Sequence, residues 1–318
     1  MTVNLITGIG GFVASHLADL LIEKGETVIG TYRWFEDLSR IKHIRDKITM
    51  VPMDLNDAVS CVKVMEEHKP DYIFHLAAQS YVSESFDYPE ATIQTNTIGT
   101  LNLLEAVRLT KDFDPIVHVC SSSEVYGLVD ESEIPIKETC KFNPSNPYAV
   151  GKVGADMIAL MYWTNYGLKT IRTRMFTHTG PRRTMMSAEC AFAKQIARIE
   201  KGIQEPILKH GNLDSIRTWA DVRDAVKAYY MLVRMGTPGE VYNIGGLTTK
   251  TIGEMLDYLI SLSDVEITKE QDPKLLRPYD VTLQIPDTSK FLQECNWKPE
   301  YKFEQTMSDL LDWWRTNV

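Results

Sequence analysis

The chain has 318 residues, of which 44% are hydrophobic and 24% are charged, so it can bury a large core in one or two lobes. Its formal net charge of −9 argues against a broad basic surface for nucleic acid or anionic lipid, and an anionic ligand would need local arginines. Its apolar runs fall short of the roughly 20 residues of a membrane span, and its first residues do not resemble a signal peptide.

Short β-branched runs alternate with amphipathic stretches through the first half of the chain. Strands are predicted over residues 3–7, 27–32, 48–55, 72–78, 116–122 and 170–176, and helices over residues 15–25, 60–69, 97–110 and 148–167. This alternation is typical of βαβ units in a doubly wound parallel sheet, whose ligand lies at the carboxyl ends of the strands. We therefore predict a Rossmann-type α/β fold.

The pattern changes after residue 180, where arginine-rich loops, prolines and a final amphipathic helix over residues 303–315 follow. We predict a dinucleotide-binding domain at residues 1–180. Residues 181–318 are expected to form mainly a smaller substrate-binding lobe, and part of this segment is allowed to return to the first domain. The adjacent Trp313 and Trp314 are expected to pack in the core of that lobe, and His75 and His118 in the core of the sheet.

The first chemical motif, ITGIGGFVASHL, lies where the first strand gives way to the first helix. Gly8 and Gly11 have no side chains there, so the backbone around Phe12 and Val13 can approach a pyrophosphate at the helix N-terminus. Ala14 takes the place of a third glycine. A tight turn without a ligand is the alternative, but the position between a strand and a helix favours dinucleotide binding.

Further candidate contacts to a cofactor follow the next three strands. The acid that would bind the ribose of NAD is missing after the second strand, where Arg33 instead offers a guanidinium for the 2′-phosphate of NADP. A solvated surface arginine is the alternative. Asp54, followed by Leu55, is placed to reach an adenine amine. Small residues after the fourth strand allow a cofactor to pass closely, and the candidates there are Leu76, Ala77, Ala78 and Ser80.

The motif NPYAVGK places Tyr148 and Lys152 four residues apart, on one face of a helix. A lysine beside a tyrosine is expected to lower the pKa of the phenol toward the range useful for proton transfer. Ser122 would hydrogen-bond the same substrate oxygen that Tyr148 deprotonates. A chance YxxxK is common, but the glycine turn, the serine cluster and this motif occur in the order that one active site needs.

The glycine turn, SSSEVYG and YAVGK together resemble the extended short-chain dehydrogenase/reductase superfamily over essentially the whole chain. Within it, AAQSYVSESF, RMFTHTGPRR, GNLDSIRTWADVRDAV and LRPYDV are similar to the GDP-mannose 4,6-dehydratases and the related GDP-4-keto-6-deoxymannose reductases. The resemblance implies an active site made by Ser122, Glu124, Tyr148 and Lys152. It also implies NADP as the cofactor and a GDP-sugar as the substrate.

The resemblance also suggests residues around that site. His178 and Arg183 match positions that contact the cofactor in the family. The predicted contacts to the sugar nucleotide are Ser80, Ser123, Thr177, Lys194, Arg217 and Arg277, the last two as candidates for the diphosphate. Surface solvation is the alternative for the charged ones. The family usually has an asparagine where this chain has Thr177, which leaves the identity of the sugar open.

Glu124 is the predicted general base. Two residues after Ser122, it is expected to project from the strand end on the same side, toward the sugar. A 4,6-dehydratase moves hydride from C4 to NADP, removes the C5 proton, expels the C6 hydroxyl as water and returns the hydride to C6. In the alternative interpretation Glu124 only caps the following turn or binds a lysine.

Two other functions remain open. A 4-keto reductase, or a 4-dehydrogenase or dehydratase acting on a related GDP-hexose or GDP-heptose, would use the same tyrosine and lysine. A non-catalytic NADP-binding regulator is disfavoured by the intact serine, tyrosine and lysine.

The assembly and location are predicted as well. We expect a homodimer through helices at residues 92–108 and 148–166, or a homotetramer in which residues 32–44 reach a neighbouring subunit. The five scattered cysteines lack metal-ligand spacing, so a cytoplasmic enzyme with free thiols and no metal is expected. Neither nucleic acid nor membrane is an expected partner.

Overall fold

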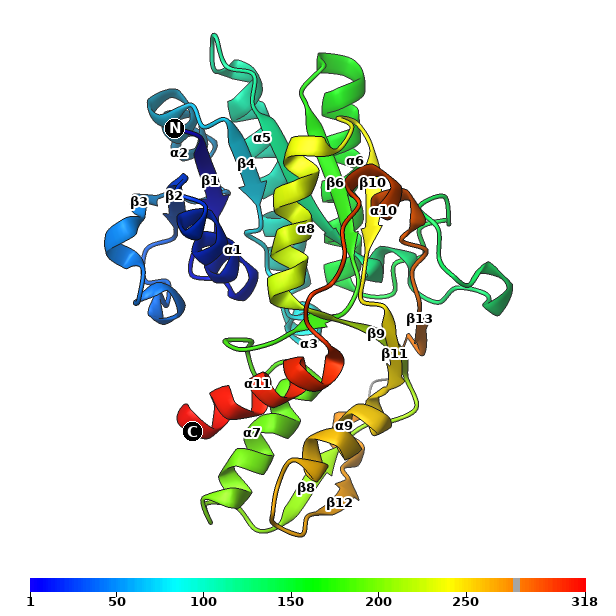
Figure 1. The fold of residues 1–318 in the computed structure, drawn as a ribbon. Coiled ribbons are helices and arrows are strands. Elements are labelled where there is room, and N and C mark those ends of the chain that lie inside the picture. Colours follow the sequence, from blue (N-terminus) through cyan, green and yellow to red (C-terminus); the bar gives the residue numbers. More distant parts are fainter. Residues whose placement is uncertain (277–280) are drawn as a thin grey trace.

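A computed structural model describes residues 1–276 and 281–318, and its largest element is a seven-stranded parallel sheet (Figure 1). The strands, in spatial order, are β10 (Val241–Ile244), β6 (Thr170–Met175), β5 (Ile116–Ser122), β4 (Tyr72–His75), β1 (Val3–Thr7), β2 (Thr27–Tyr32) and β3 (Thr49–Pro52). The chain starts in the middle of the sheet and reverses its direction of growth between β3 and β4, as in a doubly wound fold. The predicted fold class is confirmed.

Helices cover both faces of this sheet. The helices α1 (Phe12–Glu23) and α8 (Val222–Met235) lie on one face, and α2 (Ala58–His68), α5 (Gly99–Leu109) and α6 (Pro147–Tyr166) lie on the other. Neighbouring residues of β1 therefore enter different clusters, with Ile6 packing beside α1 and α8 and Leu5 beside the other three helices. Burial of both faces explains why the strands read as continuous apolar runs.

The helix leading into α5 begins earlier than the sequence pattern indicated. After α3 (Val82–Asp87), the chain forms α4 (Pro89–Ile93), one π-helical turn (Gln94–Ile98) and then α5. Asn96 in this turn accepts a hydrogen bond from the N–H of Gln79 at 2.9 Å and donates to its carbonyl at 3.0 Å. The π turn thereby fixes the loop that follows β4.

A further hydrophobic cluster is built from α7 (Ala188–Glu200), α9 (Ile252–Ser261) and α11 (Phe303–Thr316), which pack against one another in the lower part of Figure 1. Trp314 is buried there and Trp313 packs against the same cluster, as predicted. Short strands flank these helices: β7 (His178–Thr179), β9 (Ile216–Asp221), β11 (Thr248–Thr251) and β13 (Leu283–Gln284) form one sheet, and β8 (Ile207–His210) and β12 (Thr268–Gln271) form another.

Two segments from beyond residue 180 lie with the seven-stranded sheet. Helix α8 packs against α1, and β10 pairs with β6 at the edge of the sheet. Helix α10 (Ser289–Cys295) contacts both of them. The chain after residue 180 therefore contributes both to the seven-stranded sheet with its helices and to the cluster of α7, α9 and α11. The division into a cofactor domain and a substrate lobe stays a prediction.

Candidate active site

The glycine turn after β1 forms a tight cradle at the carboxyl edge of the sheet. Gly8 has φ of 68°, and a Cβ there would lie 3.0 Å from Cα of Ala77. Gly11 begins α1, and a Cβ there would lie 3.0 Å from the carbonyl oxygen of Gly8. The backbone around Phe12 at the helix N-terminus can thus approach a diphosphate without a side chain in the way. These residues fit a dinucleotide.

The loop after β4 is bound to the glycine turn. The hydroxyl of Thr7 accepts hydrogen bonds from the N–H groups of Leu76 and Ala77 at 3.1 and 3.0 Å. Ala78 is half-buried beyond them, and Ser80 is exposed. The structure therefore brings the predicted candidates after β4 next to those after β1.

The residues after β2 and β3 surround the outer end of this cradle. Arg33 is exposed, and its backbone N–H donates to the carboxylate of Glu36 at 2.9 Å. Asp54 is exposed after β3, where it accepts the N–H of Asn56 at 2.9 Å, and Leu55 is buried. Their predicted roles toward NADP stay predictions.

Arg40 is a charged residue of the cradle that sequence reasoning missed. Its guanidinium donates to the carbonyl of Gly10 at 3.3 Å and to that of Arg182 at 2.8 Å. It thereby connects the tip of the glycine turn to the loop after β7. The sequence indicated only that residues 32–44, which include Arg40, reach a neighbouring subunit, and that expectation says nothing of these carbonyl contacts.

Phe12, His178 and Arg183 come together beside the glycine turn. The ring of Phe12 stacks on His178 with 6.0 Å between ring centres and lies 5.2 Å from the guanidinium carbon of Arg183. Arg183 also forms an ion pair with Glu189 at 2.9 Å. Burial, with a contribution from Arg183, lowers the pKa of His178 to about 3, so this imidazole is neutral. Both predicted cofactor residues therefore line the same side of the cradle.

The serine cluster ends β5 at Ser122, as predicted, but Glu124 does not project from an extended strand end as expected. The strand stops at Ser122, whose hydroxyl accepts the N–H of Glu124 at 3.2 Å and so begins a 3₁₀ turn over Ser123–Tyr126. This local capping bond competes with further strand pairing. The expected strand-end projection is therefore wrong, although Glu124 is half-buried and close to Ser122.

Tyr148 and Lys152 lie in the first two turns of α6. The hydroxyl of Tyr148 is hydrogen-bonded to Ser122. Lys152 is only 7% exposed; its ammonium group donates to the carbonyl of Cys120 at 2.8 Å and lies 6.0 Å from the ring centre of Tyr148. Serine, tyrosine and lysine are thus brought together as predicted.

The sequence predicted a lowered pKa for Tyr148, and this direction is wrong. Burial raises the pKa of Tyr148 above its ordinary value, while the hydrogen bond to Ser122 opposes this shift. Burial also lowers the pKa of Lys152. Desolvation outweighs the lysine because the ammonium group is directed at a backbone carbonyl and not at the phenol oxygen.

Two amide side chains that sequence reasoning missed hold the carboxylate of Glu124. Nδ2 of Asn146 donates to Oε2 at 3.1 Å, and Nε2 of Gln284 donates to Oε1 at 3.4 Å. Asn146 is the N-cap of α6, so its position before Pro-Tyr was a usable signal. Gln284 is 160 residues away from Glu124 along the chain, and no local pattern indicates it.

The predicted sugar-nucleotide contacts are dispersed. Ser123 is buried and its hydroxyl donates to Oε1 of Gln284 at 3.0 Å, and half-buried Thr177 accepts the N–H of Ala220 through its carbonyl at 3.1 Å. The ammonium group of Lys194 lies 5.5 Å from the ring centre of Trp314. These roles stay predictions.

The two arginines proposed for the diphosphate differ in what the structure says of them. Arg217 lies on β9 and donates to the carbonyl of Ile216 at 2.9 Å and to that of Val281. Arg277 lies outside the described residues.

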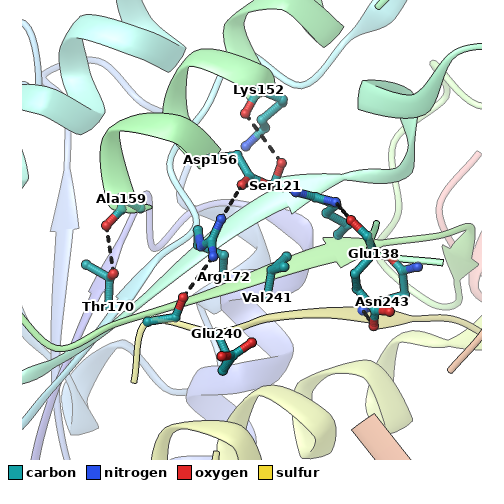
Figure 2. A network of polar contacts seen from close by, with 12 residues as sticks. Ser121, Glu138, Lys152, Asp156, Ala159, Thr170, Arg172, Glu240, Val241 and Asn243 are labelled. Atoms are coloured by element: carbon teal, nitrogen blue, oxygen red, sulfur yellow. Dashed lines mark hydrogen bonds and ion pairs between the residues drawn. The ribbon is translucent and has the colours of Figure 1, made fainter. Parts of the chain in front are cut away.

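A buried ionic network connects α6 to β6 (Figure 2). Asp156, one turn after Lys152, pairs with Arg172 and Arg174 of β6 at 2.9 Å each. Arg174 also donates to the hydroxyl of Tyr126 at 2.9 Å. Helix α6 is thus connected to β6 and to the 3₁₀ turn that carries Glu124, which holds the two parts of the site in register.

Comparison with known proteins identifies the family. A family model described as GDP-mannose 4,6 dehydratase matches residues 5–310. The chain belongs to the GDP-mannose 4,6-dehydratase family. This confirms the resemblance seen in the glycine turn, SSSEVYG and YAVGK. In the part of the chain that the structure describes, every helix is too short or too polar to cross a bilayer.

Relatives of two activities are equally similar to this member of the family. It is 32% identical to GDP-6-deoxy-D-mannose reductase of Pseudomonas aeruginosa, over 98% of this chain and 97% of that protein. It is also 32% identical to GDP-mannose 4,6-dehydratase of Yersinia enterocolitica, over 96% and 92%. A structure of RMD from Pseudomonas aeruginosa complexed with NADPH superimposes with a TM-score of 0.86 and 30% identity over 100% of both chains.

Proposed function

We propose that the protein is an NADP-dependent 4,6-dehydratase that converts a GDP-hexose to its 4-keto-6-deoxy form. The observation that carries this proposal is the half-buried carboxylate of Glu124, held by two neutral amide groups two residues from Ser122. The family and the named relatives support a GDP-sugar as substrate. The NADPH complex of the Pseudomonas aeruginosa relative, together with the cradle at Gly8 and Gly11, supports NADP as the cofactor.

The first step requires removal of the proton of the C4 hydroxyl. Held at the glycine turn around Gly8 and Gly11, NADP would supply the acceptor and donor of the hydride that this reaction needs. Tyr148 receives the hydroxyl proton, and its hydrogen bond to Ser122 favours the phenolate that this step needs. The buried ammonium group of Lys152, fixed by the carbonyl of Cys120, places a positive charge on the same side of α6.

The second step uses Glu124. The ketone at C4 makes the C5 proton acidic, and the carboxylate accepts this proton while the C6 hydroxyl leaves as water. A proton is returned to C5 after C6 has been reduced. The net reaction therefore removes one water and leaves the cofactor unchanged.

A GDP-4-keto-6-deoxymannose reductase is the second candidate. The alignment with the reductase spans 313 residues, whereas that with the dehydratase spans 345, although both cover nearly the same share of this chain. The alignment with the dehydratase thus contains more gaps. The reductase matches this chain with fewer insertions and deletions, which favours the reductase. A reductase would use Tyr148 as a proton donor and would have no need of Glu124 as a base.

The experiment that separates the two supplies purified protein with GDP-mannose in heavy water, with and without NADPH. A dehydratase gives a 4-keto-6-deoxy product with deuterium at C5 and no net consumption of NADPH. Glu124→Gln should slow this elimination by roughly 10²–10⁴-fold, the usual contribution of general acid–base catalysis. A reductase would leave GDP-mannose unchanged and would oxidise NADPH only when given the 4-keto sugar.

We also infer a homo-oligomer located in the cytoplasm. Helix α6 exposes Val150 and Met157, and Ile93 of α4 is exposed as well, which supports pairing of these helices with a second copy. Trp34 and Phe35 are strongly exposed in the arginine-rich loop after β2, where a tetramer would find another apolar contact. The five cysteines are free thiols, in accord with a reducing compartment.

A further inference from the structure

The two amide groups around Glu124 have orientations that a second partner determines. Oδ1 of Asn146 accepts the N–H of Ala149 at 2.8 Å, so its Nδ2 is the group that faces Glu124. Oε1 of Gln284 accepts the hydroxyl of Ser123 at 3.0 Å, so its Nε2 faces the other carboxylate oxygen. Each oxygen of Glu124 thus receives one N–H donor.

Both amide side chains are held rigidly. Asn146 is 7% exposed and Gln284 is 2% exposed, so water has little access to either amide. Loss of a hydrogen-bond partner would therefore leave a buried polar group unsatisfied. Asn146 is fixed as the N-cap of α6. Gln284 lies in β13, which pairs with β9 through Arg217.

The segment that follows β13 is fixed as well. Ile136 donates its N–H to the carbonyl of Ile285 at 2.8 Å, and Asp287 donates to the carbonyl of Ile136 at 2.8 Å. Backbone hydrogen bonds therefore hold the segment directly after Gln284, and the pairing of β13 with β9 holds Gln284 itself. The C-terminal part of the chain thereby reaches the residue that we assign as the base.

Neutral amides suit a carboxylate that has to accept a proton. An arginine or lysine partner would place a positive charge beside Glu124 and favour its ionised form so strongly that it would become a weaker base. An amide orients the oxygens and satisfies them without adding charge. The contacts therefore fix the direction of the carboxylate while leaving it able to take a proton.

We propose that Gln284 and Asn146 are positioning residues that aim Glu124 at the C5 proton; this rests on the proposed dehydratase function. In the step that they serve, the C5–H bond breaks, the proton passes to Glu124 and the electron pair moves toward the C4 carbonyl. The electron pair then forms the C5=C6 double bond as the C6–O bond breaks, and the hydroxide takes the proton from Glu124 and leaves as water. Neither amide contacts the sugar in this role, so both act through Glu124.

The test compares Gln284→Leu and Asn146→Ser with the unaltered enzyme. Leucine keeps much of the volume of glutamine without the donor, and serine retains the helix cap but is too short to reach Glu124. Each change should lower kcat by up to about 10²-fold, the effect of misplacing a catalytic group by 1 Å. KM for the GDP-hexose should stay the same. Gln305→Leu, at an exposed position of α11, is the matched control and should leave kcat unchanged.

Two further readouts distinguish positioning from a general structural role. Because only proton abstraction is slowed, reduced cofactor should accumulate on the enzyme in a single turnover, visible by its absorbance, and deuterium should enter C5 more slowly. In a Glu124→Gln background, Gln284→Leu should have no additional effect, since its partner is already disabled. Gln284→Met replaces the leucine variant if thermal melting shows that the latter is unfolded.

Wild-type kcat in both Gln284→Leu and Asn146→Ser would overturn the proposal. So would an equal loss from Gln284→Leu with and without Glu124, because the effect would then be structural. Failure of the proposed function has a different outcome, since the unaltered protein would then form no 4-keto-6-deoxy sugar from any GDP-hexose.

Discussion

Arg33 is the residue that we propose favours NADP over NAD. It is exposed directly after β2, where the acid typical of NAD-binding domains is missing. Arg33→Asp should weaken NADP binding by roughly 1.5–3 kcal/mol, because a charge-assisted hydrogen bond to the 2′-phosphate is lost and a like charge is added. NAD binding should change far less. Calorimetric titration with both cofactors measures this, and Arg45→Asp, in the exposed turn at residues 45–47, is the control.

Equal loss of affinity for both cofactors in Arg33→Asp would show that Arg33 is only a surface residue. Preferential binding of NAD by the unaltered protein would contradict the assignment of NADP itself.

In the proposed mechanism Tyr148 and Glu124 act in different steps, and single variants should separate them. Tyr148→Phe removes the acceptor of the C4 hydroxyl proton, so reduced cofactor should not form in a single turnover with GDP-mannose. Glu124→Gln should still form it and then stop before elimination. Rapid-mixing absorbance of the cofactor follows both variants. Reduced cofactor in Tyr148→Phe at the wild-type rate would exclude Tyr148 as the proton acceptor of the hydride step.

A buried ionic network attaches α6 to β6. Asp156 is completely buried between Arg172 and Arg174, so Asp156→Asn leaves buried guanidinium charge uncompensated. We expect a loss of about 3–5 kcal/mol in the free energy of unfolding. The control Asp114→Asn breaks an exposed ion pair with Lys169 and should cost less than about 1 kcal/mol. Urea unfolding at neutral pH measures both, and similar losses would contradict this difference.

The long helices and strands could be predicted because buried segments have a recognisable local pattern of apolar residues. The segments at residues 3–7 and 27–32 coincide with β1 and β2, since parallel strands covered on both faces are continuous apolar runs. The short strands β7 and β13 have two residues each, too few for any periodicity, and depend on pairing with β9. The end of β5 at Ser122 was predicted correctly, but the direction of Glu124 was misjudged because the hydroxyl of Ser122 caps a 3₁₀ turn there.

The residues of the candidate site also fall into those that a local motif predicts and those that it does not. The glycine turn and the pair Tyr148 and Lys152 are local motifs, and the sequence was sufficient to find them. Gln284 and Arg40 act through contacts with distant backbone and side chains, which no spacing reveals. The pKa of Tyr148 was predicted in the wrong direction because burial is a property of the assembled fold.

The molecule as a whole should be sensitive to acid because it buries neutral histidines. Burial lowers the pKa of His75 and of His118 to about 3, and burial with Arg182 lowers that of His16 to about 4. In the unfolded chain these groups titrate near pH 6.5, so the unfolded state binds more protons below that pH. The stabilisation is complete above pH 6.5 and is lost as the pH falls toward 4, at roughly 1.4 kcal/mol per pH unit for each histidine.

Urea unfolding at a series of pH values between 7.5 and about 4.5 measures this slope. His118→Gln keeps a donor for the hydroxyl of Thr173, 2.8 Å from Nε2 of His118, and removes the titrating ring. The slope of the free energy of unfolding against pH should then fall by about one proton. An unchanged slope would mean that His118 does not contribute to the acid sensitivity.

The whole molecule is also expected to assemble into a dimer. Val150 and Met157 lie two turns apart on α6 and are 43% and 38% exposed, with Ile93 of α4 also exposed. If a second copy covers them, the double variant Val150→Lys and Met157→Lys should be a monomer in light scattering, because lysine charges cannot be desolvated there without a partner. Val59→Lys on α2 is the matched control, since Val59 is 62% exposed on another helix.

The same interface should affect catalysis. Val150 lies between Tyr148 and Lys152 in the sequence, so a partner that packs on this face also supports the turn of α6 that carries both residues. The monomeric variant should therefore keep the fold but lose activity, and the unaltered enzyme should lose activity on dilution below the dissociation constant of the dimer. A monomeric wild type at micromolar concentration, or dissociation caused equally by Val59→Lys, would remove the basis for this interface.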